Sequence, residues 1–222
     1  MPQPDAAEAP AVGQGQLAPA CAGLGEGLRV AYAQLPGGAL PVSLSDTVRA
    51  LRERDLVEVA IAVGACIEGD VACVSTASAL LWAAEAGYDA VVCGIGPGIV
   101  GTASRWGHGG LAVAEAVSTA RVLGGRPVLA VRYSEGDPRE RHRGLSHHTQ
   151  AVVALAGEVE IGWPSGLEAP EGLESLTPVD VTGWQAACDG LPLAHMGRSA
   201  DEDPWFFATA FAAGRLASTY SR

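Results

Sequence analysis

The chain has 222 residues, of which 48% are hydrophobic and 18% charged, and its formal net charge is −11. This length and apolar content suit one compact domain with a sizeable core. A strongly acidic chain repels nucleic acid and anionic membranes, so we predict neither as a partner. All fourteen basic residues are arginines, so a P-loop lysine and a Schiff-base lysine are excluded.

The cysteines and the first residues of the chain indicate the cellular compartment of the protein. Five cysteines are scattered without a C-x-x-C pair, which favours reduced thiols over a disulfide framework. The first ten residues are acidic and lack the apolar core of a signal peptide. No apolar run reaches about 18 residues without glycine or charge, so no membrane span is predicted. We therefore predict a cytoplasmic protein.

The first 27 residues are rich in alanine, proline, glycine and glutamine. We predict disorder for the first dozen and a short helix over 16–24. On this basis the chain divides into a flexible or partial N-terminal segment, 1–27, and a single α/β domain, 28–222.

From residue 28 onward, short apolar runs alternate with amphipathic stretches of helical length. Strands are predicted at 28–33, 57–63, 90–93 and 127–133, and helices at 46–54, 76–86, 110–123 and 147–156. Three of these helices have suitable caps, namely Ser45, Ser75 or Thr76, and Ser146. The strands are continuously apolar, which is typical of a sheet buried on both faces. We therefore predict an α/β fold with a mainly parallel sheet, a Rossmann-like three-layer sandwich.

The remainder of the chain is less regular. Residues 157–190 contain three prolines and several acids, with one further strand predicted at 178–181. A last strand is predicted at 193–196 and a closing helix at 203–218, with Pro204 near its start.

Polar residues gather directly after the predicted strands. The segments concerned are 64–70, 94–102, 137–149 and 197–203. In a parallel sheet the carboxyl ends of the strands meet at one edge, where ligands bind. We therefore expect these loops to form one site.

The segment 94–102 is a glycine loop, and we predict ligand contacts from Gly94, Gly96, Gly98, Gly101 and Thr102. Glycines allow backbone amides to approach an anion closely. The spacing of the last three glycines matches G-x-G-x-x-G, but Pro97 removes an amide and no suitably placed acid follows. An anion cradle, a dinucleotide site and a purely structural turn remain open.

The segment Asp137–Thr149 holds three of the five histidines and three of the arginines. In one hypothesis, Arg139, Arg141, Arg143 and His148 hold a carboxylate or phosphate while His142 or His147 moves a proton. We take His142, His147 and Asp137 as candidate catalytic residues.

In a second hypothesis, the three histidines bind a metal with Asp137 as oxygen ligand. The spacing H-x4-H-H matches no zinc signature, however, and the arginines disfavour a cation. We predict no metal and name no cofactor.

A third hypothesis is structural. The segment Arg198–Asp203 carries both charge signs, and Arg198 and Asp201 are further candidates for ligand contact. Asp201, Glu202 and Asp203 are also suited to pair with the basic segment, within the chain or in a second copy. Asp201 and Asp203 are placed to cap the last helix as well.

Three motifs in this order resemble a bacterial family of unknown function, the domain of unknown function 3866 (DUF3866). They are Gly94-Ile-Gly-Pro-Gly-Ile-Val-Gly-Thr102, Asp137-Pro-Arg-Glu-Arg-His-Arg-Gly-Leu-Ser-His-His-Thr149, and Met196-Gly-Arg198 with Asp201-Glu-Asp-Pro204. The resemblance covers about 28–218 and implies a soluble cytoplasmic protein, but no activity. Family members have a β-rich N-terminal portion for which we find no counterpart here.

The sequence thus predicts a small-molecule-binding α/β protein with an anion-binding cleft. An enzyme acting on a phosphorylated or carboxylated metabolite is the first hypothesis. A non-catalytic ligand-binding or regulatory module and a homo-oligomeric structural protein are the alternatives.

Overall fold

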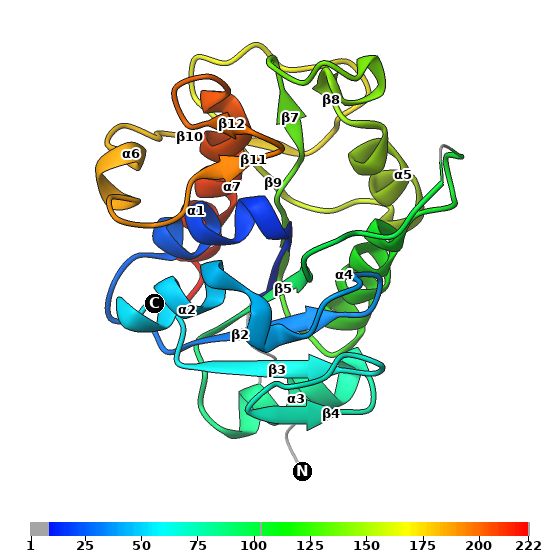
Figure 1. Ribbon diagram of the computed structural model, residues 1–222, viewed down its shortest axis with the longest axis vertical. Helices are drawn as coiled ribbons and strands as arrows, with labels where there is room; N and C mark the ends of the chain where they lie inside the picture. Colours follow the sequence, from blue (N-terminus) through cyan, green and yellow to red (C-terminus); the bar gives the residue numbers. More distant parts are fainter. Residues whose placement is uncertain (1–8, 103, 222) are drawn as a thin grey trace.

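The computed structural model describes residues 9–102 and 104–221, and its centre is a sheet of six parallel strands (Figure 1). Their order is β4-β3-β2-β5-β1-β6, and every neighbouring pair is parallel. The strands are β1 (Ala9–Gly13), β2 (Val30–Leu35), β3 (Val59–Val63), β4 (Val71–Cys73), β5 (Ala90–Ile95) and β6 (Pro127–Leu129). The α/β class and the mainly parallel sheet are as predicted.

Helices cover both faces of this sheet. They are α1 (Gln14–Leu24), α2 (Asp46–Glu53), α3 (Thr76–Glu85), α4 (Ala112–Val122), α5 (His147–Ala156), α6 (Trp184–Ala187) and α7 (Pro204–Ala217). Buried side chains form two apolar clusters, one with α1, α2, α6 and α7 and the other with α3, α4 and α5. None of the described helices is long and apolar enough to cross a membrane.

Strand β2 shows why the sheet strands are continuously apolar. Val30 and Tyr32 belong to the first cluster, whereas Ala31 and Ala33 belong to the second. Successive side chains of a strand point to opposite faces, so a strand covered on both faces needs apolar residues at every position.

The connections follow from the handedness of parallel crossovers. The chain moves toward β4 through α1 and α2, and both pack on one face. It moves back toward β6 through α3 and α4, and these pack on the other. Right-handed crossovers require this change of face when the direction along the sheet reverses.

Short strands extend the structure beyond β6. They are β7 (Tyr133–Ser134) paired with β8 (Gly144–Leu145), β9 (Ile161–Pro164) with β10 (Leu176–Val179), and β11 (Ala194–His195) with β12 (Arg198–Ser199). A parallel bridge between Val128 and Glu160 attaches the β9 side to the edge strand β6. Strands β4, β8, β9 and β12 were not predicted, and the predicted strand 127–133 overlaps β7 only at Tyr133.

The prediction for the N-terminal segment was partly wrong. Residues 1–8 lie outside the described residues, but Ala9–Gly13, expected within a disordered stretch, is strand β1. This strand stands inside the sheet, between β5 and β6. The helix expected over 16–24 is present as α1. Its Pro19 is tolerated although proline removes one hydrogen bond of a helix.

The predicted helix caps are confirmed. Ser45 Oγ accepts a hydrogen bond from the Val48 amide at 3.2 Å, and Ser146 Oγ accepts one from the His148 amide at 3.2 Å. Ser75 forms a reciprocal capping box with Ser78. Helix α7 is not capped in this way, because the side chain of its N-cap residue, Asp203, makes no hydrogen bond to the helix.

Helices α1 and α7 approach each other closely through two glycines. A Cβ on Gly214 would collide with the carbonyl oxygen of Ala20, and one on Gly23 with that of Phe211. The absence of side chains at these points allows the two backbones to touch, which sets the position of α1 over the sheet.

We expect Gly214→Ala to destabilise the protein by roughly 1–3 kcal/mol, because the added methyl group forces the helices apart. Alanine's better helix propensity, worth about 0.5–1 kcal/mol, offsets only part of this. Denaturant unfolding followed by circular dichroism measures the change. Val122→Ala in α4, where the side chain is 85% exposed, is the control and should shift stability by less than about 0.5 kcal/mol. Equal stability of the two variants would contradict the close packing.

Candidate functional site

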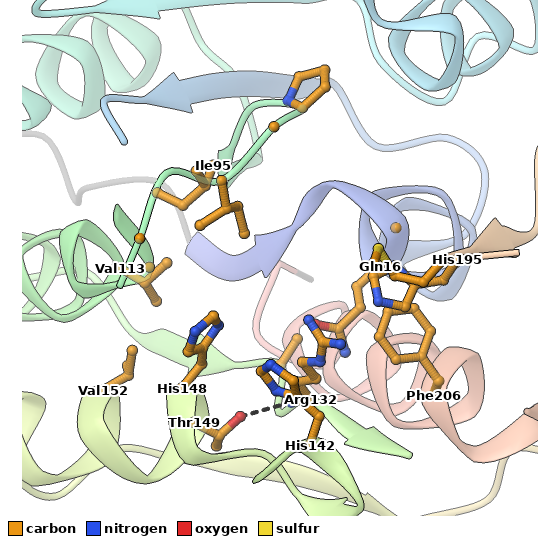
Figure 2. A pocket seen from close by; sticks show the side chains of 18 of the residues that line it. Gln16, Ile95, Val113, Arg132, His142, His148, Thr149, Val152, His195 and Phe206 are labelled. Carbon is orange, nitrogen blue, oxygen red and sulfur yellow. Dashed lines mark hydrogen bonds between the residues drawn. The ribbon is translucent and has the colours of Figure 1, made fainter. Parts of the chain in front are cut away.

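A cavity of about 550 Å³ lies at the carboxyl ends of three neighbouring strands, β5, β1 and β6. Gly15 lines it just after β1, Ile95 at the end of β5 and Leu129 at the end of β6. Figure 2 shows His142 and His148 on one side of Arg132 and Gln16, His195 and Phe206 on the other. The polar lining of the cavity comes from Gln16, Thr47, Thr102, Arg132, Arg139, Arg141, His142, His148, Thr149 and His195.

This position is a switch point of the sheet. Strand β1 is followed by α1 on one face, whereas its neighbour β5 is followed by α4 on the other. Helices that leave adjacent strands on opposite faces open a crevice beyond the strand ends, where ligands bind in open α/β sheets. The cavity is therefore located where the topology predicts one.

The start of α1 forms part of the cavity wall and was missed by sequence analysis. Gly15 and Gln16 line the cavity, and the Gln16 side chain donates to the Val131 carbonyl at 2.7 Å. A signal for this turn was present, because the spacing G-x-G-x-x-A occurs in Gly13-Gln-Gly-Gln-Leu-Ala18 between strand and helix. The sequence analysis does not use this spacing because it predicts a flexible or partial segment over 1–27.

The glycine loop is only partly at the cavity. Gly96, Gly98, Gly101 and Thr102 line it. Gly94 does not belong to the loop, because it is a buried residue within β5 paired with both β1 and β2.

Two of these glycines also have packing reasons. A Cβ on Gly96 would lie 2.5 Å from the side chain of Gln34, and one on Gly101 would lie 2.8 Å from that of His108. Close packing therefore requires glycine at these two positions, and the same two residues can still contact a ligand in the cavity.

Asp137 is completely buried and forms ion pairs with three arginines. Its Oδ2 lies 2.9 Å from Arg132, 2.8 Å from Arg139 and 3.2 Å from Arg198. Burial alone would raise the pKa of Asp137, but the hydrogen bonds and charge of Arg139, with Arg132, hold this pKa well below its usual range. These contacts occupy its carboxylate, so the geometry favours positioning of the arginines over the catalytic role that we assigned to Asp137.

A second buried carboxylate, Asp203, completes this network. Its Oδ2 accepts from Arg198 at 3.0 Å and from the Ser134 hydroxyl at 2.5 Å. The two segments thus pair within one chain through Arg198 and Asp137, whereas Asp203 contacts Arg198 and residues 134–136 and none of the arginines of the basic segment. Asp201 is exposed, does not line the cavity and makes no hydrogen bond or ion pair with the described residues.

The three arginines of the basic segment point to different places. An extended segment would align them, but Glu140–His142 forms a 3-10 turn. Arg139 is partly buried against Asp137, and Arg141 is exposed and lines the cavity. Arg143 is exposed and does not line it, so the structure does not bring all three arginines together at the cavity.

Arg132 takes the place that we expected for Arg143. It lines the cavity, and its Nε is buried without a hydrogen-bond partner among the described residues. Its backbone amide donates to Thr149 Oγ1 at 2.9 Å, which fixes it beside α5. The sequence analysis missed it because the strand was predicted to run to Tyr133, whereas β6 ends at Leu129.

Four imidazoles gather at the start of α5. The ring centroid of His148 lies 3.9 Å from that of His108, 4.4 Å from that of His147 and 4.9 Å from that of His142. His142 Nδ1 lies 2.7 Å from Ser146 Oγ. The chain therefore folds His142 back onto the two histidines that follow the Ser146 cap.

These imidazoles are neutral at pH 7. Burial lowers the pKa of His142 to about 3, with a further contribution from Arg132. Burial and the neighbouring His108 lower the pKa of His148 to about 3 and also lower that of His147. Neutral rings offer a lone pair to a donor or a metal ion. A pKa near 3 makes His142 a weak general base while the cavity is empty of anions.

The fifth histidine, His195, stands apart. Its ring stacks on Phe206 with centroids 4.1 Å apart, and its Nε2 is buried without a hydrogen-bond partner among the described residues. Burial, followed by the charges of Arg132 and Arg198, lowers its pKa to about 4.

We expect Asp137→Asn to lower the free energy of unfolding by about 3–5 kcal/mol, because it leaves buried guanidinium groups without their counter-charge. Urea unfolding at pH 7.5 measures this change. Asp201→Asn is the matched control and should be neutral, since Asp201 is exposed. Similar stabilities for the two variants would show that the arginines do not depend on Asp137.

We also expect His195 to make stability depend on pH. Its folded pKa of about 4 is below the ordinary value of 6.5, so the unfolded chain binds the proton first. Its contribution is complete above pH 6.5 and is lost as the pH falls toward 4. Between these values the wild type should lose about 1.4 kcal/mol more per pH unit than His195→Gln. Parallel curves of unfolding free energy against pH would contradict the burial of a neutral ring.

Comparisons with known proteins identify the family. No curated protein and no solved structure matches the chain. A family model described as "Protein of unknown function (DUF3866)" matches residues 14–214, which includes the switch-point cavity and every histidine. The chain therefore belongs to the DUF3866 family.

Proposed function

We propose that the protein binds a small phosphorylated or carboxylated metabolite in the cavity at the carboxyl edge of its sheet. The observation that supports this most is the convergence of a helix N-terminus with Arg132, Arg139 and Arg141 on one cavity. Both kinds of group attract anions, and the chain supplies them from segments far apart in sequence.

The start of α1 contributes backbone donors. The first four N–H groups of an α-helix have no partner within the helix, and its dipole adds partial positive charge there. Gly15 lies in this first turn and lines the cavity. A phosphate or carboxylate at this point would accept hydrogen bonds from amides that are otherwise unpaired within the helix.

The arginines differ in how free they are to meet a ligand. Arg139 and Arg132 share Asp137, so part of their hydrogen-bonding capacity is used. Arg141 forms no ion pair with any described residue and is exposed at the cavity. We assign Arg141 the main contact to the anion, with Arg132 and Arg139 providing positive potential behind it.

The size and topology of the site favour a metabolite over a dinucleotide. A volume of about 550 Å³ is within the ordinary range for small-molecule pockets. In dinucleotide-binding folds, an acidic residue at the end of the second strand binds the ribose, beside the first strand. Here β2 ends in Gln34 and Leu35, and β5 lies between β2 and β1.

We propose further that the domain is a Rossmann-like three-layer sandwich in its general plan. Helices on both faces and a crevice at a switch point support this, although the strand order differs from the most common 3-2-1-4-5-6 order. The cytoplasm remains our proposed compartment, supported by five cysteines that are all free.

Hydrolysis or group transfer on the bound metabolite is the catalytic form of this proposal. Neutral His142 and His148 line the cavity that would hold the anion. An anion bound beside Arg132 would offset its charge and raise the pKa of His142, while burial, the larger cause of the low value, would remain. A binding or regulatory module would show the same anion binding without turnover.

We expect Arg141→Ala to weaken anion binding about 10- to 100-fold, because a charge-assisted hydrogen bond contributes about 1.5–3 kcal/mol. Calorimetric titration with inorganic phosphate and with pyrophosphate at low salt measures the affinity. Arg143→Ala removes the same charge two residues away without touching the cavity, so it should bind like wild type. Equal weakening in both variants would indicate a general charge effect and reject the site. A wild type that binds neither anion at millimolar concentration would reject it too.

A further inference from the structure

We propose that His142, His147 and His148 bind one zinc ion at the wall of the cavity. One ligand nitrogen from each of the three imidazoles lies within 4.8 Å of the others. A tetrahedral zinc ion with Zn–N bonds of about 2.0–2.1 Å needs nitrogens roughly 3.4 Å apart. Small side-chain rotations therefore suffice to close the site.

The ring nitrogens are available for a metal. His147 Nε2 is buried and has no hydrogen-bond partner among the described residues. Ser146 Oγ engages Nδ1 of His142, which leaves Nε2 of that ring as its metal-binding atom. A hydrogen bond to the other ring nitrogen is the usual way in which a metal-binding histidine is oriented. The same hydroxyl accepts from the His148 amide, so one residue positions two of the ligands.

The nearby arginines do not exclude a cation. Arg132, Arg139 and Arg198 are paired with Asp137 and Asp203, which leaves a formal excess of +1 in that network, and the further charge of Arg141 is on an exposed side chain where solvent screens it. The same pairing means that Asp137 is not a ligand, as its carboxylate already accepts from all three arginines. A ligand set made only of imidazoles suits zinc. Three imidazole ligands leave the fourth coordination position of a tetrahedral zinc ion open.

The spacing of the histidines had led us to predict no metal. It differs from known zinc signatures because H-x4-H-H brings ligands together only after the short β7–β8 hairpin and the Ser146 cap have formed. His142 and His148 both line the cavity, so the open position would adjoin the proposed anion site. The zinc site goes beyond that proposal and does not depend on anion binding, but a His142 that holds zinc through Nε2 and Ser146 through Nδ1 has no ring nitrogen left to act as the base.

Zinc binding is tested on the full chain after removal of metal with a chelator. Competition against a chromophoric chelator measures the zinc affinity and stoichiometry, and Co²⁺ substitution reports the geometry. We expect one zinc per chain, and the intense visible absorption of tetrahedral Co²⁺. His147→Ala should weaken zinc binding by more than 100-fold, and Ser146→Ala by about 10- to 100-fold as an orienting residue. His195→Ala is the control and should bind like wild type.

Circular dichroism tests whether each variant is folded. If His147→Ala does not fold, His148→Gln serves as the ligand variant in its place. Binding below one equivalent, an octahedral Co²⁺ spectrum, or equal affinity in His147→Ala and His195→Ala would overturn the site. Phosphate titration of the metal-free protein keeps the two proposals apart. If phosphate binds there and zinc does not, only the metal site fails. If zinc binds and phosphate does not, only the anion site fails.

Discussion

The arrangement of the candidate site depends on one buried carboxylate, Asp137, which holds three arginines from two parts of the chain. Arg132 follows β6, Arg139 belongs to the same loop and Arg198 lies on β12. Isolated guanidinium groups are costly to bury, and a buried carboxylate is costly without partners. Each group is therefore stabilised only by the presence of the others. The consequence is that the loops after β6 and β11 are fixed relative to each other.

A second constraint places the cavity above that network. Strand β1 stands between β5 and β6, while its helix α1 leaves on the opposite face from α4. Close contact between α1 and α7 through Gly23 and Gly214 keeps the start of α1 over the strand ends. The helix amides, the paired arginines and the histidines of α5 therefore surround the same space. This is how the proposed anion site can exist on a protein whose net charge is −11.

Sequence patterns predicted the regular elements well, and the site less completely. Runs such as Val59–Val63 and caps such as Ser146 have local causes, so they could be identified from sequence. Strand β1 could not, because Ala-Pro-Ala-Val-Gly has weak strand propensity and is stabilised by two neighbouring strands. The basic segment was found as a cluster, yet which arginine faces the cavity depends on a 3-10 turn and on pairing with Asp137. Proximity of His142 to His147 and His148 is likewise a property of the folded loop.

The central claim is that the carboxyl edge of β1, β5 and β6 binds a small anion. Nuclear magnetic resonance of ¹⁵N-labelled protein titrated with inorganic phosphate tests it at individual amides. The account predicts saturable shifts of the Gly15 and Gln16 amides, with one dissociation constant shared by Gly98 and Arg141. Amides near Arg121 and Glu158, at the second cavity beyond the amino end of β6, should stay unchanged. Saturable shifts confined to that distant region, or none at Gly15 and Gln16, would contradict the account.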